Sequence, residues 1–204
     1  MPTLEIESHY QGIVGGVDEV GRGPWAGPVM AAVAIFLESP PPSLLKNIED
    51  SKKLSKIKRE NIYGELMELE AFHYGVGLAS VEEIDRLNIS KATFLAMARA
   101  VQSLPQKPHA LLIDGKYIPS FEGIQTRAVI GGDGISLSIA AASILAKVRR
   151  DKMMEDLSLE HPNYGWERNA GYGTAEHQKA LEIHGVTPHH RRSFAPVKVL
   201  LNLL

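Results

Sequence analysis

Short apolar runs separated by Gly- and Pro-rich breaks recur through the first two thirds of the chain. Their content of β-branched residues predicts five strands, at 13–18, 29–37, 71–79, 109–114 and 125–130. The first two runs are joined by GRGPWAGP, which contains too much Gly and Pro for a helix. We therefore expect these two strands to form an antiparallel hairpin with a long loop.

Apolar residues at helical spacing predict the other elements. One helix follows Ser55, and Ser80 and Glu83 form a capping box that opens a short helix, with another helix over 89–103. The segment 136–157 has the strongest helical pattern of the chain. The first three helices therefore lie between predicted strands, and the helix over 136–157 follows the last strand.

The last quarter of the chain is less regular. HPNYGWERNAGYG, at 161–173, predicts an irregular loop. Thr174 can cap a helix that runs to about His184, and the apolar tail after Ser193 predicts a final docked helix.

The order of these elements predicts an α/β fold with a mixed sheet and helices on its faces, because the strands and helices do not alternate strictly. We expect an N-terminal tail over 1–12, a core over 13–160, and a C-terminal loop and helical extension over 161–204 packed on that core.

Composition narrows the class of protein. The 204 residues are 44% hydrophobic and 23% charged, which is typical of a globular chain. No cysteine is present, so disulfides and thiolate metal ligands are excluded. The N-terminus lacks the basic and apolar regions of a signal peptide, and no run approaches the roughly 18 apolar residues of a membrane span. We expect a cytoplasmic protein that does not contact membranes.

Two stretches concentrate positive charge, although the formal net charge is −2. Taken alone, each stretch is explained equally well as a solvated helix face or as a surface that holds a polyanion. The residues are Lys52, Lys53, Lys56, Lys58 and Arg59 in the first stretch, and Lys147, Arg149, Arg150 and Lys152 in the second.

Four carboxylates follow predicted strands. Asp18 and Glu19 end the first strand, Asp114 ends the fourth in LLIDG, and Asp133 follows the fifth in GGDG. A single Asp-Gly is most often a turn, but three strands that each deliver an acid favour a ligand site. Several carboxylates in one place repel each other unless a cation lies among them.

The type of ligand indicates the type of metal. An oxygen-rich site without Cys favours a hard cation, Mg²⁺ or Mn²⁺, rather than zinc. The spacing of His177, His184, His189 and His190 matches no zinc finger, and we expect these side chains at the surface or facing a substrate. A pair of divalent ions suits phosphoryl transfer, for which the basic stretches would hold a polyanionic substrate.

A competing motif lies beside the first acids. Gly21-x-Gly23-x-x-Ala26 follows a strand and fits the dinucleotide-binding fingerprint with Ala as its third member. That fingerprint must open a helix, whereas Pro24 and Pro28 precede a β-like run. A nicotinamide-dependent oxidoreductase is therefore the weaker alternative, which a cofactor titration would exclude.

Five motifs together resemble bacterial ribonuclease HII, of the type 2 ribonuclease H family. They are GVDEVGRGPWAGPV, DSKKLS, LLIDG, GGDGISLSIAAASILAKVRRD and AGYGTAEH, and the likeness runs from about residue 13 to 196. The resemblance implies a ribonuclease H-like fold: a five-stranded mixed sheet flanked by helices, with a C-terminal helical extension. It makes 13–160 the catalytic core.

The resemblance also implies an activity. The family's enzymes are metal-dependent endoribonucleases that hydrolyse the RNA strand of RNA/DNA hybrids. They also cut 5′ to single ribonucleotides embedded in duplex DNA, by two-metal-ion hydrolysis that leaves a 3′-OH and a 5′-phosphate. The expected cofactor is Mn²⁺ or Mg²⁺, and the expected partners are RNA/DNA hybrids and ribonucleotide-containing DNA duplexes. A monomer without an obligate protein partner is the default.

By the same resemblance, Asp18, Glu19, Asp114 and Asp133 match the family's catalytic, metal-binding acids. Neighbouring strand residues point to opposite faces. We therefore expect Asp18 to project centrally from the strand, and Glu19 to reach in from the side where the strand gives way.

Other residues match the family's contacts to substrate. Its Gly-Arg-Gly loop meets the ribonucleotide 2′-OH and the adjacent phosphate, and its tyrosine stacks on the sugar beside the RNA-to-DNA junction. Close backbone approach suits glycine, and the 2′-OH is what separates RNA from DNA. The matching residues are Gly21, Arg22 and Gly23 for the loop, Tyr172 for the stack, Lys52, Lys53, Ser143 and Lys147 for phosphates, and Arg150 as a further phosphate contact.

The sequence departs from the family pattern at Gly131, where the family often has Lys, and this puts one substrate contact in doubt. Asp151 is a rival for the fourth acid, but we expect it on a helix and salt-bridged. Two alternatives remain close to this interpretation. The first is ribonuclease HIII, which carries an extra N-terminal domain, and the 12 residues before the first strand are too few for such a domain. The second is a nucleic-acid binding protein without catalysis. Acids near a polyanion weaken binding unless metal is bound, which argues against the latter.

Overall fold

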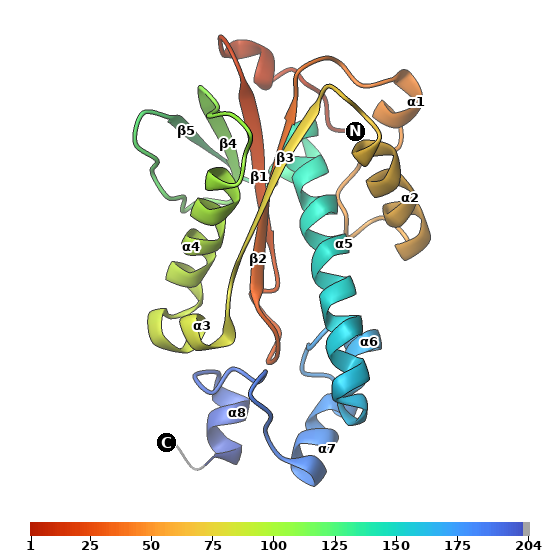
Figure 1. Ribbon diagram of the computed structural model, residues 1–204, viewed down its shortest axis with the longest axis vertical. Coiled ribbons are helices and arrows are strands. Elements are labelled where there is room, and N and C mark those ends of the chain that lie inside the picture. The colour runs from red at the N-terminus through yellow and green to blue at the C-terminus, as the bar shows by residue number, and fades with distance from the viewer. Residues whose placement is uncertain (202–204) are drawn as a thin grey trace.

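The computed structural model describes residues 1–201, which form one sheet covered by helices on both faces (Figure 1). The strand order is β3-β2-β1-β4-β5. The pairs β1–β2 and β2–β3 are antiparallel, whereas β1–β4 and β4–β5 are parallel. The expected mixed sheet and its first hairpin are thus confirmed. The strands are β1 (Val14–Val20), β2 (Val29–Phe36), β3 (Phe72–Ala79), β4 (Ala110–Asp114) and β5 (Gln125–Val129).

The helices fall close to their expected places. Within residues 1–201, none of them combines the length and apolar character that crossing a bilayer requires. The α-helices are α1 (Pro42–Leu45), α2 (Lys56–Met67), α3 (Val81–Leu87), α4 (Ile89–Gln102), α5 (Leu137–Glu160), α6 (Trp166–Asn169), α7 (Ala175–His184) and α8 (Ala195–Leu200). Short 3₁₀ helices are η1 (Glu7–His9), η2 (Gly132–Gly134) and η3 (Pro162–Tyr164).

Glycines in the strands let the two helical layers lie close to the sheet. α4 covers one face against β2 and β3, and α5 crosses the other against β1 and β2 (Figure 1). A Cβ added at Gly16 would lie 2.2 Å from the Ile139 nitrogen of α5, and one at Gly77 would lie 2.3 Å from the Ala96 oxygen of α4. Only glycine therefore fits at these two positions.

Side-chain caps confirm two expected helix starts. Ser80 Oγ accepts the Glu83 N–H at 3.3 Å, and Glu83 Oε2 accepts the Ser80 N–H at 3.0 Å, which closes the capping box before α3. Thr174 Oγ1 accepts the His177 N–H at 3.2 Å and caps α7. These local signals were readable because each involves residues three positions apart.

The segment expected to be an irregular loop, 161–173, contains the short helices η3 and α6, so that expectation is wrong in part. Tyr164 and Trp166 anchor these turns in a buried cluster with Met154 of α5. Ala26, from the loop between β1 and β2, belongs to the same cluster. The C-terminal segment is thereby fixed against the loop that follows the first acids.

Candidate active site

β1 carries two of the predicted acids at the point where its pairing with β4 ends. Pairing with β4 stops at Val17 and Ile113, whereas pairing with β2 continues through Asp18 and Glu19. The expectation that the strand gives way at Glu19 is therefore wrong. By this register Asp18 is level with Asp114, the last residue of β4, and Glu19 lies one residue beyond the end of that strand.

Asp18 is the most enclosed of the four acids, with 5% of its surface exposed. Its Oδ1 accepts the Glu19 N–H at 2.7 Å. Burial raises the pKa of Asp18 well above its usual range, and the charges of Glu19 and Asp114 raise it further. The Glu19 N–H and the Ser143 hydroxyl act in the opposite direction without cancelling the shift. Ionised Asp18 is thus disfavoured among its neighbours.

Glu19 lies on the opposite face of β1 from Asp18, as strand alternation requires. It lines a cavity of about 280 Å³ with Asp114 and with Phe94 of α4. Burial raises the pKa of Glu19, and Arg22, whose Nη1 lies 3.3 Å from Glu19 Oε1, opposes the shift. The cavity therefore brings acids from two strands together beneath the exposed Arg22.

Asp114 ends β4 and Asp133 lies in η2. Asp114 Oδ1 accepts the Gly132 N–H at 2.7 Å, which ties the two acid-bearing segments to each other. Burial raises the pKa of Asp133, and the charges of Asp50 and Asp114 add to the shift. Lys52 opposes it, with Nζ 3.7 Å from Asp133 Oδ2.

The four acids form one electrostatic group without forming a tight ligand cluster. Within residues 1–201, three ligand atoms within 4.8 Å of one another occur at Glu160, His161 and His189, and not among the four acids. The donor set of the acids still fits a hard divalent cation. All its donors are oxygens, and such a cation would relieve the burial and repulsion that raise three of the four pKa values.

The predicted substrate loop begins directly after β1. Gly21 has a φ of +87°, a conformation that favours glycine. A Cβ added at Gly23 would lie 3.4 Å from Tyr172 Cε1, so the loop and the ring are in contact. The Arg22 side chain and the Tyr172 ring are both exposed, Tyr172 by 45%. Loop and ring therefore present one surface beside the acids.

Lys52 is held over the acids by buried hydrogen bonds in its own segment. Arg59 Nη1 donates to the carbonyls of Ser51 at 2.7 Å and of Leu54 at 3.1 Å. The Ser51 and Ser143 hydroxyl oxygens are 2.6 Å apart. Burial acts to lower the pKa of Lys52, but the surrounding carboxylates outweigh it and leave that pKa raised.

The two other predicted phosphate-binding lysines differ in how firmly carboxylates hold their ammonium groups. Lys53 is exposed, with Nζ 3.5 Å from a Glu49 carboxylate oxygen. Lys147 Nζ donates to Asp151 Oδ1 at 2.7 Å, and Asp151 Oδ2 lies 3.6 Å from Arg59 Nη2. Asp151 is therefore salt-bridged on a helix, as expected of a residue outside the metal site.

Arg150 was expected to reach a phosphate, and that expectation is wrong. Its side chain is completely buried and donates to the carbonyls of Ala26, Pro28 and Ala170 at 2.9–3.1 Å. Arg191 is equally buried, and nothing in the sequence suggested a role for it. No local pattern marks Arg191, because its acceptors lie up to 170 residues earlier in the chain.

His177 and His190 are buried, so the expectation of a surface or substrate-facing role is wrong for these two. His190 Nδ1 accepts the Thr187 N–H at 2.9 Å, which leaves the His190 Nε2 proton for His177 Nε2 at 3.0 Å. His177 Nδ1 then donates to the Tyr172 carbonyl at 2.9 Å. Burial lowers the pKa of both imidazoles, that of His190 to about 3. This neutral pair supports the backbone of Tyr172.

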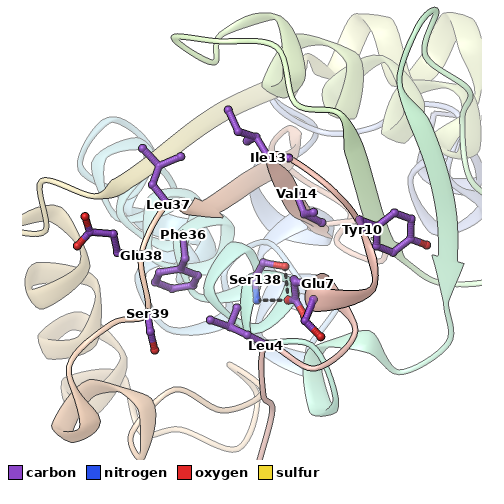
Figure 2. A pocket seen from close by; sticks show the side chains of 12 residues that line it. Leu4, Glu7, Tyr10, Ile13, Val14, Phe36, Leu37, Glu38, Ser39 and Ser138 are labelled. Carbon is purple, nitrogen blue, oxygen red and sulfur yellow. Dashed lines mark hydrogen bonds between the residues drawn. The ribbon is translucent and has the colours of Figure 1, made fainter.

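A second cavity, of about 320 Å³, lies at the start of β1 and the end of β2, away from the acids (Figure 2). Glu7 on its wall turns one carboxylate oxygen, Oε1, toward the start of α5. That oxygen accepts hydrogen bonds from the Ser138 N–H at 3.0 Å, the Ser138 hydroxyl at 2.6 Å and the Ser136 hydroxyl at 2.7 Å. The bonds tie the N-terminal residues to the helix that passes behind Asp18.

Comparison with known proteins gives the family. The family described as Ribonuclease HII matches residues 15–197. A ribonuclease HII from Paramagnetospirillum magneticum is 59% identical over 198 residues, covering 97% of this chain and 97% of that protein.

Solved structures agree with this relationship. The ribonuclease H2 crystal structure from Pyrococcus horikoshii is 27% identical, with a TM-score of 0.76 over 94% of this chain and 98% of that one. Bst-RNase HIII, in complex with Mn²⁺, shares the fold at 21% identity, with a TM-score of 0.69 over 96% of this chain and 72% of that one. The chain therefore belongs to the ribonuclease HII family and is a metal-dependent endoribonuclease that degrades the RNA strand of RNA/DNA hybrids.

Proposed function

We propose that Asp18, Glu19, Asp114 and Asp133 are the catalytic acids and hold Mg²⁺ or Mn²⁺. The observation that carries this proposal is their shared electrostatic strain, because burial and mutual repulsion raise the pKa of three of the four. Oxygen donors of this kind are the ligands that hard divalent cations prefer. The Mn²⁺ complex of the structurally similar ribonuclease HIII is in keeping with this choice.

The proposed reaction is hydrolysis of the phosphodiester 5′ to a ribonucleotide, leaving a 3′-OH and a 5′-phosphate. Two divalent cations held by the acids would supply an activated water and neutralise charge on the leaving oxygen. Lys52, poised 3.7 Å from Asp133, adds positive charge where the phosphate would lie. Arg22, beside Glu19, adds more from the opposite face of β1.

Recognition of the ribonucleotide is assigned to the loop that follows β1. Gly21, Arg22 and Gly23 would meet the 2′-OH and the adjacent phosphate, while Tyr172 stacks on the sugar beside the RNA-to-DNA junction. Support comes from the contact between Gly23 and the Tyr172 ring and from the exposure of that ring. Such a site would accept single ribonucleotides in DNA as well as long hybrids.

The substrate backbone would be held by groups on α5 and on the segment before α2. Lys53 is free enough to reach a phosphate as it stands. Lys147 must exchange its contact with Asp151 for one with the phosphate. Ser143 is 4% exposed, so its contact requires a phosphate placed close to Asp18.

The test is a duplex DNA with one embedded ribonucleotide, offered to purified protein with Mg²⁺ or Mn²⁺. We expect one cut, 5′ to the ribonucleotide, with a 3′-OH product that a polymerase can extend. The same duplex without the ribonucleotide is the control and should stay intact. An intact ribonucleotide duplex beside a cleaved RNA/DNA hybrid would contradict the proposal for single ribonucleotides.

A further inference from the structure

Two arginines are buried behind the Gly-Arg-Gly loop without a carboxylate partner. Arg150 and Arg191 are each 0% exposed, and every bond recorded for their guanidinium groups within residues 1–201 goes to a backbone carbonyl. Burial lowers the pKa of Arg191 to about 9 and that of Arg150 to about 10, so both stay cationic at neutral pH. A buried charge persists only where its hydrogen bonds are well satisfied.

Arg191 makes four hydrogen bonds to the loop between β1 and β2. Its Nη2 donates to the Gly21 carbonyl at 2.5 Å and its Nη1 to the Arg22 carbonyl at 3.0 Å. Its Nε donates to the Gly27 carbonyl at 2.9 Å, and its backbone N–H to the Trp25 carbonyl at 2.7 Å. One residue near the C-terminus therefore fixes both ends of the loop.

These bonds determine which way the loop's peptide groups face. In a trans peptide, the carbonyl of one residue and the N–H of the next point in opposite directions, and residues 1–201 contain no cis peptide. Because the Gly21 and Arg22 carbonyls point inward to Arg191, the N–H groups of Arg22 and Gly23 point outward. Neither N–H donates to another group within residues 1–201.

Arg150 also supports the loop, from its buried side. A Cβ added at Gly21 would lie 2.2 Å from Arg150 Nε, so the loop rests directly on the guanidinium. A side chain at Gly21 would have to displace a group that is tied to three carbonyls. The inner side of the loop is therefore enclosed at Gly21, and the two N–H groups face outward beside Tyr172.

We propose that Arg191 is a positioning residue for sugar recognition: by holding the Gly21 and Arg22 carbonyls inward, it aims the Arg22 and Gly23 N–H groups at the ribonucleotide. This inference rests on the proposed function of the loop. Arginine suits the task because its planar fork binds two carbonyls at once, which a lysine ammonium does not do in a fixed geometry. Preference for ribose over deoxyribose then depends on a residue that does not touch the substrate.

The test compares binding of two duplexes in an Asp18→Asn background, which prevents cleavage. One duplex carries a single ribonucleotide and the other is all DNA of the same sequence, and fluorescence anisotropy with Mg²⁺ gives both dissociation constants. We expect Arg191→Lys and Arg191→Gln to reduce the preference for the ribonucleotide about tenfold, since two aimed hydrogen bonds are lost. Affinity for the all-DNA duplex should change little.

Arg59→Lys is the matched control. Arg59 is also a buried arginine that donates to two carbonyls, but they belong to Ser51 and Leu54. It should lower thermal stability. Because the Lys52 segment that Arg59 supports would contact phosphates of both duplexes alike, the ratio of the two dissociation constants should stay unchanged. If the preference survives in both Arg191 variants, the positioning role of Arg191 is overturned, while the proposed recognition of single ribonucleotides still stands. A parent protein with no preference would overturn the proposed recognition of single ribonucleotides as well.

Amide hydrogen exchange measured by NMR decides the matter if the Arg191 variants do not fold. In the Asp18→Asn protein, the Arg22 and Gly23 amides should exchange fast when free and become protected with the ribonucleotide duplex, but less so with the all-DNA duplex. Amides already protected in the free protein, or equally protected by both duplexes, would overturn the inference.

Discussion

The two sides of the site hold charge in opposite ways. On the acid side, Asp18 and Asp114 each accept one backbone N–H, and burial and like charge raise the pKa of Asp18. On the arginine side, Arg150 and Arg191 are buried more deeply, yet carbonyls surround their guanidinium groups. The acid side thus gains from a cation supplied from outside, whereas the arginine side is complete in itself.

This contrast separates chemistry from recognition. Unsatisfied carboxylates lower the stability of the metal-free fold, and in the proposed site they would hold a metal ion. Satisfied guanidinium groups make the neighbouring loop rigid, so that its outward N–H groups are aimed before substrate arrives. Changes on the acid side should therefore lower the cleavage rate and raise the stability of the metal-free protein, whereas changes on the arginine side should lower stability.

The largest expected effect is on the acid side. Asp18→Asn removes a proposed metal ligand and should lower the cleavage rate more than about 10³-fold, because several kcal/mol of transition-state stabilisation would be lost. Binding of the ribonucleotide duplex should be largely spared, since it depends on the loop and the lysines. Single-turnover cleavage and anisotropy measure the two quantities. Normal cleavage by this variant would refute the metal assignment.

On the arginine side, Arg150→Met should unfold more easily by about 3 kcal/mol, because three buried carbonyls lose their donor. Denaturant unfolding measures the change. Arg149→Met is the control from the same helix: Arg149 lies over the Tyr63 and Tyr74 rings at the surface, so its loss should cost less than about 1 kcal/mol. Equal losses in the two variants would contradict the contrast.

The buried histidines should give a pH dependence to the support of the Tyr172 backbone. The pKa of His190 is lowered to about 3 by burial and by the neighbouring His177. Between that value and the ordinary pKa of about 6.5, the unfolded chain binds more protons, so stability falls as pH falls through this window and is fully present above it.

We expect His190 to contribute a slope of up to about 1.4 kcal/mol per pH unit to the free energy of unfolding, measured in urea between about pH 7 and pH 5. His190→Gln should show a shallower slope because the titrating group is gone. Parallel slopes for the two proteins would show that His190 does not titrate as described.

The smallest expected effect is at Gly131, where the sequence departs from the pattern expected from the resemblance, which has Lys. A Cβ there meets nothing within 4 Å, but φ is +64°, so Gly131→Lys should cost about 1 kcal/mol of stability. The added cation should lower KM about threefold at low salt and less at high salt. Gly131→Gln carries the same backbone cost without the charge. A KM that falls equally in both variants would exclude a phosphate contact.

Features of the fold and site that depend on residues close together in sequence could be predicted, whereas features that depend on distant residues could not. The acids could be singled out as candidates because they follow short apolar strands, and a salt-bridged Asp151 on a helix could be expected from its basic neighbours. The extent of β1 was not, because its pairing with β2 continues after its pairing with β4 has stopped.

The buried charges were beyond sequence reasoning for a different reason. Arg150 looks like any exposed helix cation until the carbonyls of Ala26 and Pro28 are brought to it by the β1–β2 loop. Arg191 and His190 likewise depend on partners that only the folded chain supplies. Whether these polar side chains are buried depends on hydrogen-bond acceptors distant in sequence, and the hydrophobic periodicity of the chain does not reveal those acceptors.

The most direct test of the central claim is the free energy of unfolding of the wild type and of Asp18→Asn, with and without Mg²⁺. Without metal, Asp18→Asn should be the more stable protein, because a buried and repelled carboxylate is gone. Mg²⁺ at ten times its dissociation constant should stabilise the wild type by about 1.4 kcal/mol and the variant much less. A wild type that is the more stable protein without metal, or equal stabilisation of both by Mg²⁺, would contradict the account.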